Sequence, residues 1–263
     1  MRGTVPAELP RPETVDPGEL ARAFAAGGLD LVCVLGPTAS GKTRYAVNLA
    51  RAMSAPGMPA EIISADSRQV YRGMDIGTGK DLSEYGEVPY HLIDILPAGE
   101  HYNVYSYCED FARAYSGIRS RGAIPILCGG TGLYINAVTT GYDFRTSKPL
   151  SAPGAGPSLR TYYIGTLVSR EERNARIDAR LTARLQEGLV EEVRGLLDSG
   201  VPAATLKAYG LEYKFVTQYV LGEIGYDGMF TLLSTAIHQF AKRQMTWFRG
   251  MERAGTVIHW VEV

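Results

Sequence analysis

The sequence contains few cysteines and almost no net charge. Its 263 residues include only Cys33, Cys108 and Cys128, and an odd number of cysteines at wide spacing does not fit a disulfide framework, so we expect reduced thiols. The 27 basic and 28 acidic side chains leave a net charge of -1. This balance excludes a protein that binds nucleic acid through a global positive field, and any contact with RNA would need a local basic patch.

Long apolar runs are missing as well. Prolines and acidic residues interrupt residues 1–20, where a signal peptide needs an unbroken apolar core, and no later run has the length of a membrane span. The four histidines are scattered without the spacing of zinc ligands. We therefore expect a cytoplasmic protein with no membrane segment and no zinc site, in which residues 1–28 form a flexible N-terminal arm with one short helical turn.

A phosphate-binding loop is present. The apolar run from Leu31 to Leu35 is typical of a buried parallel strand, and it leads directly into GPTASGKT, which fits the pattern GxxxxGK[ST]. In such loops the backbone N–H groups and the N-terminus of the next helix bind phosphate oxygens, the lysine adds a mobile charge, and the Ser/Thr hydroxyl holds Mg²⁺. The predicted phosphate ligands are Gly36, Pro37, Thr38, Ala39, Ser40, Gly41, Lys42 and Thr43, with Thr43 as the Mg²⁺ ligand.

Alternating strand and helix patterns follow this loop. Apolar runs predict further strands at residues 61–65, 91–96, 123–128, 161–168 and 257–261, and helical spacing predicts helices at 102–121, after Ser169, after Gly188 and at 229–250. The order indicates an α/β fold: a P-loop NTPase-like parallel sheet flanked by helices, with a C-terminal helical part. Residues 29–263 are predicted to form a single domain, in which the Pro/Gly/Ser-rich stretch 141–160 is a linker or mobile loop.

Polar residues follow two of the predicted strands, at the sheet edge where ligands bind in parallel folds. Asp66 can accept a proton from a substrate or bind a magnesium-bound water, while Arg68 and Gln69 can contact a base or a phosphate. Thr131, within Gly129–Gly132, can donate its hydroxyl to a ligand that approaches the backbone closely. A helix cap at Asp66 and a simple turn at Thr131 are the structural alternatives. Asp94 is a weaker candidate for a metal-associated acid, because its apolar run continues past it.

Two later helices carry basic residues. Ser169 and Glu172 match a capping box, and the helix they open carries Arg173, Arg176, Arg180 and Arg184 along one face. Solvation is the default for such arginines, but those nearest the capped end can reach a bound diphosphate. In the C-terminal helix, basic groups interleave with Trp247 and Phe248, which suits RNA binding, although a solvated basic face is an equal alternative.

In combination, these motifs resemble those of the bacterial tRNA dimethylallyltransferases, also called tRNA isopentenyltransferases. They occur in the family's order over most of residues 31–261. The matching segments are GPTASGKT at 36–43, ADSRQVYRGMDIGTGK at 65–80, HLIDIL at 91–96, PILCGGTGLY at 125–134, SREERNARIDARL at 169–181, GLVEEVRGLLDSG at 188–200 and FAKRQMTWFR at 240–249.

The resemblance implies transfer of a dimethylallyl group from dimethylallyl diphosphate to N6 of adenine 37 in the anticodon stem-loop of tRNA, and we expect a monomer. It implies that the phosphate loop, with Lys42 and Mg²⁺ on Thr43, binds the leaving diphosphate, and that Arg176 or Arg170 adds to its stabilisation. Asp66 would accept the N6 proton, and Thr131 would hydrogen-bond near the transferred carbon. The expected adenine and tRNA contacts are Asp66, Ser67, Arg68, Gln69, Thr131, Lys242 and Arg243.

Two departures from the family leave the acceptor open. The family carries a helical insertion after the Gly-Gly-Thr helix, where this chain has only the stretch 141–160, and Gly210–Lys214 differs from the usual Gly-Tyr-Lys-Glu. An adenylate isopentenyltransferase, which would not need the insertion, is the first alternative. A phosphate-loop kinase of a small metabolite and a non-catalytic RNA-binding relative are the others. The joint presence of Lys42, Thr43, Asp66 and Thr131 argues against a pure binder.

Overall fold

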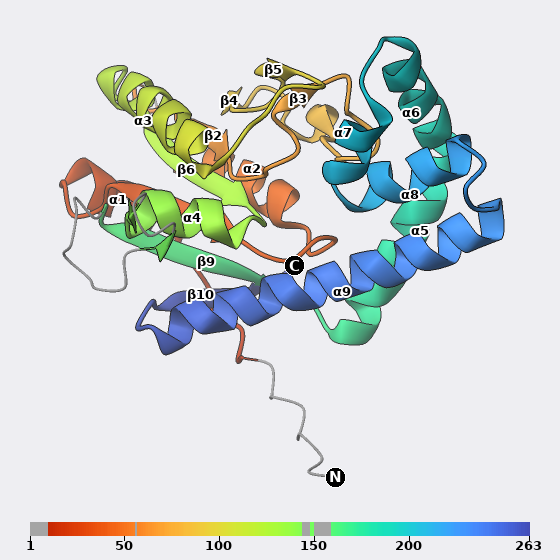
Figure 1. Ribbon diagram of the computed structural model, residues 1–263. Helices are drawn as coiled ribbons and strands as arrows, with labels where there is room; N and C mark the ends of the chain where they lie inside the picture. Colours follow the sequence, from red (N-terminus) through yellow and green to blue (C-terminus); the bar gives the residue numbers. More distant parts are fainter. Residues whose placement is uncertain (1–9, 56, 144–147, 150–158) are drawn as a thin grey trace.

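The central element is a six-stranded parallel sheet with the strand order β10-β9-β1-β6-β2-β4 (Figure 1). The computed structural model describes residues 10–55, 57–143, 148–149 and 159–263. The strands are β1 (Leu31–Leu35), β2 (Ala60–Ser64), β4 (Tyr90–His91), β6 (Ile124–Gly129), β9 (Thr161–Leu167) and β10 (Ile258–Glu262). The predicted α/β fold with a parallel sheet is confirmed.

Helices cover both faces of this sheet, which explains why β1 is a continuous apolar run. Val32 and Val34 pack in the same cluster as residues of α1 and α2, whereas Leu31, Cys33 and Leu35 pack in the cluster that contains residues of α3 and α4. The bounds of these helices are α1 (Pro17–Ala25), α2 (Lys42–Met53), α3 (Val104–Ser120) and α4 (Gly132–Thr139).

Five further helices form the C-terminal helical part, which has a core of its own. They are α5 (Arg170–Glu187), α6 (Leu189–Asp198), α7 (Ala203–Ala208), α8 (Leu211–Val220) and α9 (Tyr226–Arg253). Ser169 caps α5 as predicted, since its hydroxyl accepts the Glu172 N–H at 3.1 Å. The long helix α9 joins the two parts: Leu233 packs in the helical core and Phe248 in the sheet core (Figure 1).

The predicted strand at residues 91–96 is wrong. β4 ends at His91, β5 (Leu96–Pro97) pairs instead with β3 (Tyr71–Arg72), and Leu92 and Asp94 between them have φ angles of 63° and 56°. Those angles do not occur in a strand. The Asp94 carboxylate pairs with the buried ammonium of Lys80, and this pairing outweighs the local apolar pattern.

Residues 10–28 also differ from the flexible arm predicted for 1–28. α1 is capped by Asp16, whose side chain accepts the Gly18 N–H at 2.8 Å, and it buries Leu20 and Phe24 against the sheet. These apolar side chains share a spacing of four residues, a signal too short to identify a helix alone. Residues 1–9 lie outside the described part of the chain.

The remaining small elements are a 3₁₀ turn (Leu82–Glu84) and the pair β7 (Tyr142–Asp143) and β8 (Lys148–Pro149). Most of the 141–160 stretch lies outside the described residues, so its predicted character as a linker or mobile loop is untested there. In the described part of the chain, no helix combines the length and the apolar character needed to cross a membrane.

Candidate functional site

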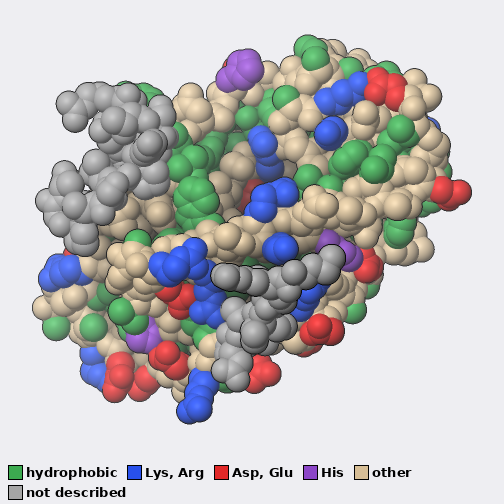
Figure 2. Space-filling view, turned by 60° about the horizontal axis from the view of Figure 1, so that its bottom comes forward, with side chains coloured by type: hydrophobic (Ala, Val, Ile, Leu, Met, Phe, Trp, Pro, Cys, Tyr) green, Lys and Arg blue, Asp and Glu red, His purple; other side chains and the backbone are tan. Residues whose placement is uncertain are grey.

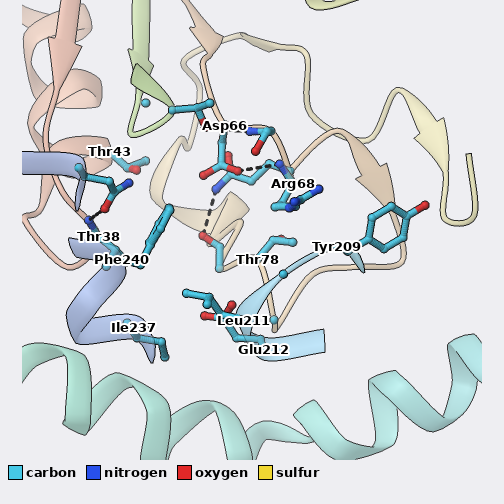
Figure 3. A pocket seen from close by; sticks show the side chains of 18 of the residues that line it. Thr38, Thr43, Asp66, Arg68, Thr78, Tyr209, Leu211, Glu212, Ile237 and Phe240 are labelled. Carbon is cyan, nitrogen blue, oxygen red and sulfur yellow. Dashed lines mark hydrogen bonds between the residues drawn. The ribbon is translucent and has the colours of Figure 1, made fainter. Parts of the chain in front are cut away.

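A cavity of about 320 Å³ opens at the carboxyl ends of β1, β2 and β6, between the sheet and the helical part. Figure 2 shows Lys and Arg side chains around the hollow near the centre of one face. In Figure 3, Thr38 and Thr43 lie at one end of the cavity, Tyr209 at the other, and Asp66 faces Ile237 across it. A second hollow shares Lys42, Thr43 and Arg180 with this cavity and is also lined by Ala39, Gly41, Arg44, Asp81, Glu84 and Arg176.

The phosphate loop presents one half of this site. Gly41 takes a φ of +77° just before α2 begins, and no side chain caps that helix, so its first N–H groups are available to an anion. The Lys42 ammonium lies 3.4 Å from the Pro37 carbonyl, and burial lowers its pKa. The Ser40 hydroxyl contacts that of Thr166 at 2.6 Å in the core, so only the backbone of Ser40 can serve a ligand.

Asp66 and Thr131, predicted to act together, line the same cavity. The Thr131 hydroxyl accepts the Ser67 N–H at 3.2 Å and keeps its own proton for another acceptor. One Asp66 oxygen accepts the Arg68 N–H at 2.8 Å in a tight turn, which leaves the second oxygen for a substrate. Ser67, Arg68 and Gln69 also line the cavity. Arg68 lies over the Tyr209 ring, and Gln69 donates to the Gly79 carbonyl at 3.3 Å.

The arginines of α5 differ in their distance from the two hollows. Arg176 lines the second hollow, but Arg170 is exposed and lines neither hollow. Arg180 and Arg184, which were not among the predicted diphosphate ligands, line the main cavity. The spacing of four residues from Arg176 to Arg180 and from Arg180 to Arg184 places the three on one helix face, and this was the available signal.

Glu212 is a further cavity residue that sequence reasoning did not select. It lies 3.6 Å from Arg184, and burial raises its pKa while Arg184 opposes that effect. Glu212 belongs to the segment 210–214 that departs from the family wording. The departure of this segment from the family motif was therefore the sequence feature that could have indicated Glu212.

Helix α9 contributes the opposite wall. Gln244 is buried and connects two ligand loops: its carbonyl accepts the Thr38 N–H at 2.8 Å and its amide donates to the Gly130 carbonyl at 3.0 Å. A polar residue on an inward-facing apolar stripe was the signal for it. Of the two predicted tRNA contacts on this helix, Arg243 lines the cavity and Lys242 is exposed outside it.

The residues at the start of α2 fit a magnesium ion. Among the described residues, the Thr43 hydroxyl forms no hydrogen bond. The carboxylates of Glu84 and of Asp81, which pairs with Arg180, line the same hollow. A single hydroxyl with nearby carboxylates is the kind of oxygen set that Mg²⁺ uses when substrate phosphates and waters complete its shell.

Family comparisons identify relatives over most of the chain. The family described as IPP transferase matches residues 69–155 and 144–251, and the family described as Isopentenyl transferase matches residues 29–87. A tRNA dimethylallyltransferase 2 of Porphyromonas gingivalis is 47% identical over 287 residues, covering 88% of this chain and 93% of the relative. A tRNA dimethylallyltransferase 2 of Bacteroides fragilis is 44% identical over 289 residues, covering 89% and 92%.

Solved structures give the same result. The full-length tRNA isopentenylpyrophosphate transferase of Bacillus halodurans superposes with a TM-score of 0.76 at 29% identity, covering 89% of each chain. The aligned 287 residues of the Porphyromonas relative exceed the 263 residues of this chain, so that relative has residues without a counterpart here. The two IPP transferase matches overlap at residues 144–155, inside the stretch predicted to be a shortened insertion.

Proposed function

This chain belongs to the tRNA dimethylallyltransferase family, and on that basis we propose that it transfers a dimethylallyl group from dimethylallyl diphosphate to N6 of adenine 37 in tRNA. The observation that carries the proposal is the shared cavity. It brings Lys42 and Thr43, which suit a diphosphate, together with Asp66, which can accept an amine proton, and Thr131, which can donate a hydrogen bond.

The reaction forms a bond from adenine N6 to the allylic carbon and breaks the bond from that carbon to the diphosphate oxygen. Negative charge then develops on the diphosphate, where Lys42, the N–H groups of the phosphate loop and Arg180 would stabilise it. Arg176, in the adjoining hollow, would add to this stabilisation. Mg²⁺ held by Thr43 would supply further charge neutralisation when it is bound.

Asp66 would accept the proton that leaves N6, so that the product amine is neutral. The diphosphate would depart with the electron pair of the broken carbon–oxygen bond. Thr131 would donate its hydroxyl at the reacting end of the cavity. Leu211, Ile237 and Phe240 give this cavity apolar lining that suits a five-carbon group. Arg68 and Tyr209 would contact the adenine or a neighbouring base.

The exposed side of α9 would contact the RNA. Phe240 and Trp247 are more than a third exposed, and the Arg243 guanidinium lies over the Phe240 ring, 5.9 Å from its centroid; Lys242 is also exposed on this helix. Aromatic and basic groups on one surface suit the anticodon stem-loop. Because the substrate is tRNA, we expect the enzyme to act in the cytoplasm, and we expect a monomer.

An assay with two acceptors tests the proposal. The purified protein is incubated with Mg²⁺ and dimethylallyl diphosphate, and either unmodified tRNA or AMP is added; the nucleosides are then analysed by mass spectrometry. We expect a dimethylallyl adduct on adenine 37 of tRNA and none on AMP. Prenylation of AMP with untouched tRNA would instead establish an adenylate isopentenyltransferase, which the short 141–160 stretch would suit. Transfer of the γ-phosphate of ATP to an acceptor would establish a kinase.

Gly79→Ala is expected to raise the KM for dimethylallyl diphosphate about tenfold. A Cβ atom at Gly79 would lie 1.6 Å from Arg184 Nη2 and 2.4 Å from Arg180 Nη2, so both guanidinium groups must leave their positions in the cavity. Steady-state kinetics with varied donor measures the change, and one displaced charge-assisted contact corresponds to about a tenfold loss.

Gly73→Ala is the matched control. Gly73 has a φ of +73° and Gly79 a φ of +59°, so both alanine variants carry a left-handed backbone cost of about 1 kcal/mol. At Gly73, however, the nearest atom is a Leu196 methyl at 4.0 Å and no cation is displaced. An equal rise in KM for both variants would show that backbone strain, rather than the arginines, causes the effect.

A further inference from the structure

The loop from Asp75 to Lys80 has one side in the cavity and one side against α6. Gly77, Thr78 and Gly79 line the cavity. The Gly77 carbonyl accepts from Arg184 at 3.4 Å, and the Gly79 carbonyl accepts from Arg180 at 3.4 Å. This loop therefore helps to hold two cavity arginines, which also pair with carboxylates: Arg180 with Asp81, and Arg184 with Glu212 at 3.6 Å.

Glu192 of α6 binds the other side of the loop. One carboxylate oxygen accepts the N–H groups of Asp75 and Ile76, each at 2.7 Å, and the second accepts the Gly77 N–H at 3.0 Å and the Tyr213 hydroxyl at 2.7 Å. Burial and the neighbouring Glu192 raise the pKa of Tyr213, which keeps this phenol a donor. One carboxylate thus satisfies four donors, although Glu192 itself lines neither the cavity nor the second hollow.

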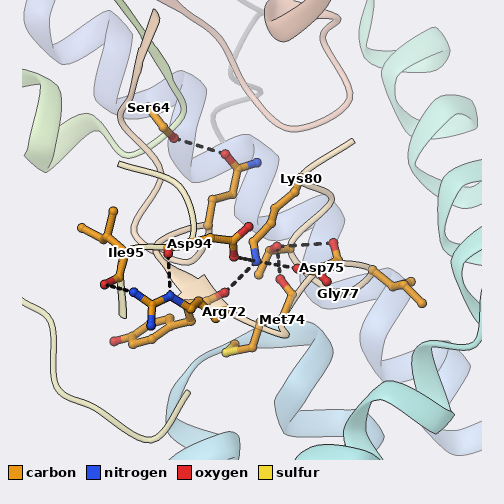
Figure 4. Close-up of polar contacts among 12 residues, drawn as sticks. Ser64, Arg72, Met74, Asp75, Gly77, Lys80, Asp94 and Ile95 are labelled. Carbon is orange, nitrogen blue, oxygen red and sulfur yellow. Dashed lines mark hydrogen bonds and ion pairs between the residues drawn. The ribbon is translucent and has the colours of Figure 1, made fainter. Parts of the chain in front are cut away.

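Lys80 holds the end of the same loop (Figure 4). Its buried ammonium donates to the Tyr71 carbonyl at 2.6 Å and to the Asp75 carboxylate at 2.6 Å, and it also pairs with Asp94. Two charged groups of opposite sign therefore fix the loop, and only the glycine segment between them faces the cavity. Among these contacts Glu192 is the anion of the helical part that binds the loop N–H groups, whereas Arg180 and Arg184 contact its carbonyls.

We propose that Glu192 is a positioning residue for the diphosphate: by binding three consecutive N–H groups of the loop, it sets the Gly77 and Gly79 carbonyls that hold Arg184 and Arg180 in the cavity. The inference rests on the proposed function in taking the ligand to be a diphosphate. It assigns Glu192 no contact with the substrate.

Glu192→Gln tests this role with little change in size. An amide nitrogen in place of either carboxylate oxygen would face two groups that now donate to that oxygen, and at least one N–H would lose its acceptor. We expect the Kd for inorganic pyrophosphate with Mg²⁺, measured by calorimetry, to rise about tenfold. The KM for tRNA should stay within about twofold, because a loss confined to the diphosphate end does not disturb the RNA surface.

Glu191→Gln is the matched control, because Glu191 is the preceding residue of α6 and its side chain is 67% exposed. We expect its pyrophosphate Kd to stay within about twofold of the wild-type value. In a background with Arg180→Gln and Arg184→Gln, Glu192→Gln should have no further effect on pyrophosphate binding, since its effect passes through those arginines. If Glu192→Gln does not fold, Glu192→Asp keeps the charge and should give a smaller loss, of about threefold.

Any of these results would overturn the inference: an unchanged pyrophosphate Kd in Glu192→Gln, an equal loss in Glu191→Gln, or a full additional loss in the double-arginine background. A parallel rise in the KM for tRNA would also overturn it, because it would indicate general loosening of the fold. The proposed function fails separately, if the wild-type protein does not transfer dimethylallyl to tRNA. In that case the pyrophosphate measurements still decide the role of Glu192.

Discussion

Replacing Lys42 with methionine is expected to lower kcat/KM for dimethylallyl diphosphate by about 10³-fold. Lys42 lines both the main cavity and the second hollow, and it is the flexible cation of the phosphate loop. Methionine keeps much of the length and apolar volume of the side chain but cannot stabilise the charge that develops on the leaving diphosphate. The variant is measured by single-turnover transfer to tRNA under saturating and limiting donor.

Lys214→Met is the control for this variant, because Lys214 is an exposed lysine of α8 that lines neither hollow, and its kcat/KM should match the wild type.

The pH dependence of kcat/KM is a second test of the role of Lys42. Burial lowers the pKa of Lys42 from its ordinary value of 10.5, so the required ammonium is lost at a lower pH than in an exposed lysine. We expect kcat/KM to fall on the alkaline side in the wild type, and we expect Lys42→Met to lack that fall. Near-normal turnover in Lys42→Met would exclude the diphosphate role of the loop.

Removal of the base is expected to have the second-largest effect. Asp66→Asn should lower kcat by about 10²-fold or more, in the range of a lost general base, and should leave pyrophosphate binding nearly intact. Asparagine keeps the side-chain oxygen that accepts the Arg68 N–H, so the turn after β2 is preserved while the proton acceptor is lost. Rapid-quench measurement of the first turnover separates this chemical step from product release.

Asp66→Ala provides the comparison for that variant. It should lose at least the same factor of about 10² in kcat, and it should also raise the KM for tRNA, because it removes the acceptor that holds the Arg68 backbone. If Asp66→Asn retains near-normal turnover while Asp66→Ala loses it, Asp66 only shapes the turn. The base would then have to be sought elsewhere in the cavity.

The diphosphate half of the site could be predicted almost completely from local sequence. A phosphate loop is a continuous segment whose ligands are backbone groups, one lysine and one hydroxyl, so adjacency in the chain is adjacency in space. Asp66 and Thr131 could be predicted for a related reason: each lies just after a strand, and the carboxyl ends of parallel strands meet at one edge of the sheet. The roles of all these residues stay predictions until the variants are measured.

Contacts between segments that are distant in the sequence could not be predicted in this way. The apolar run after β4 forms a turn instead of a strand, because this turn brings the Asp94 carboxylate to the Lys80 ammonium. Leaving that buried ammonium unpaired would cost more free energy than the lost strand pairing. From helix position alone, Arg170 at the capped start of α5 is expected to lie nearer the phosphate loop than Arg180 and Arg184. The structure instead brings the middle of α5 to the glycine segment at Gly77–Gly79.

The sequence alone determined the parallel α/β fold, the phosphate loop and the order of the family's motifs, since apolar periodicity and short continuous patterns encode local structure directly. Only the tertiary structure decided which arginines face the cavity, that Gln244 joins the Thr38 and Gly130 backbones, and that Glu192 binds the far side of a cavity loop. These contacts join segments up to 206 residues apart, and packing of the helical part against the sheet, not any local pattern, sets the distances between them.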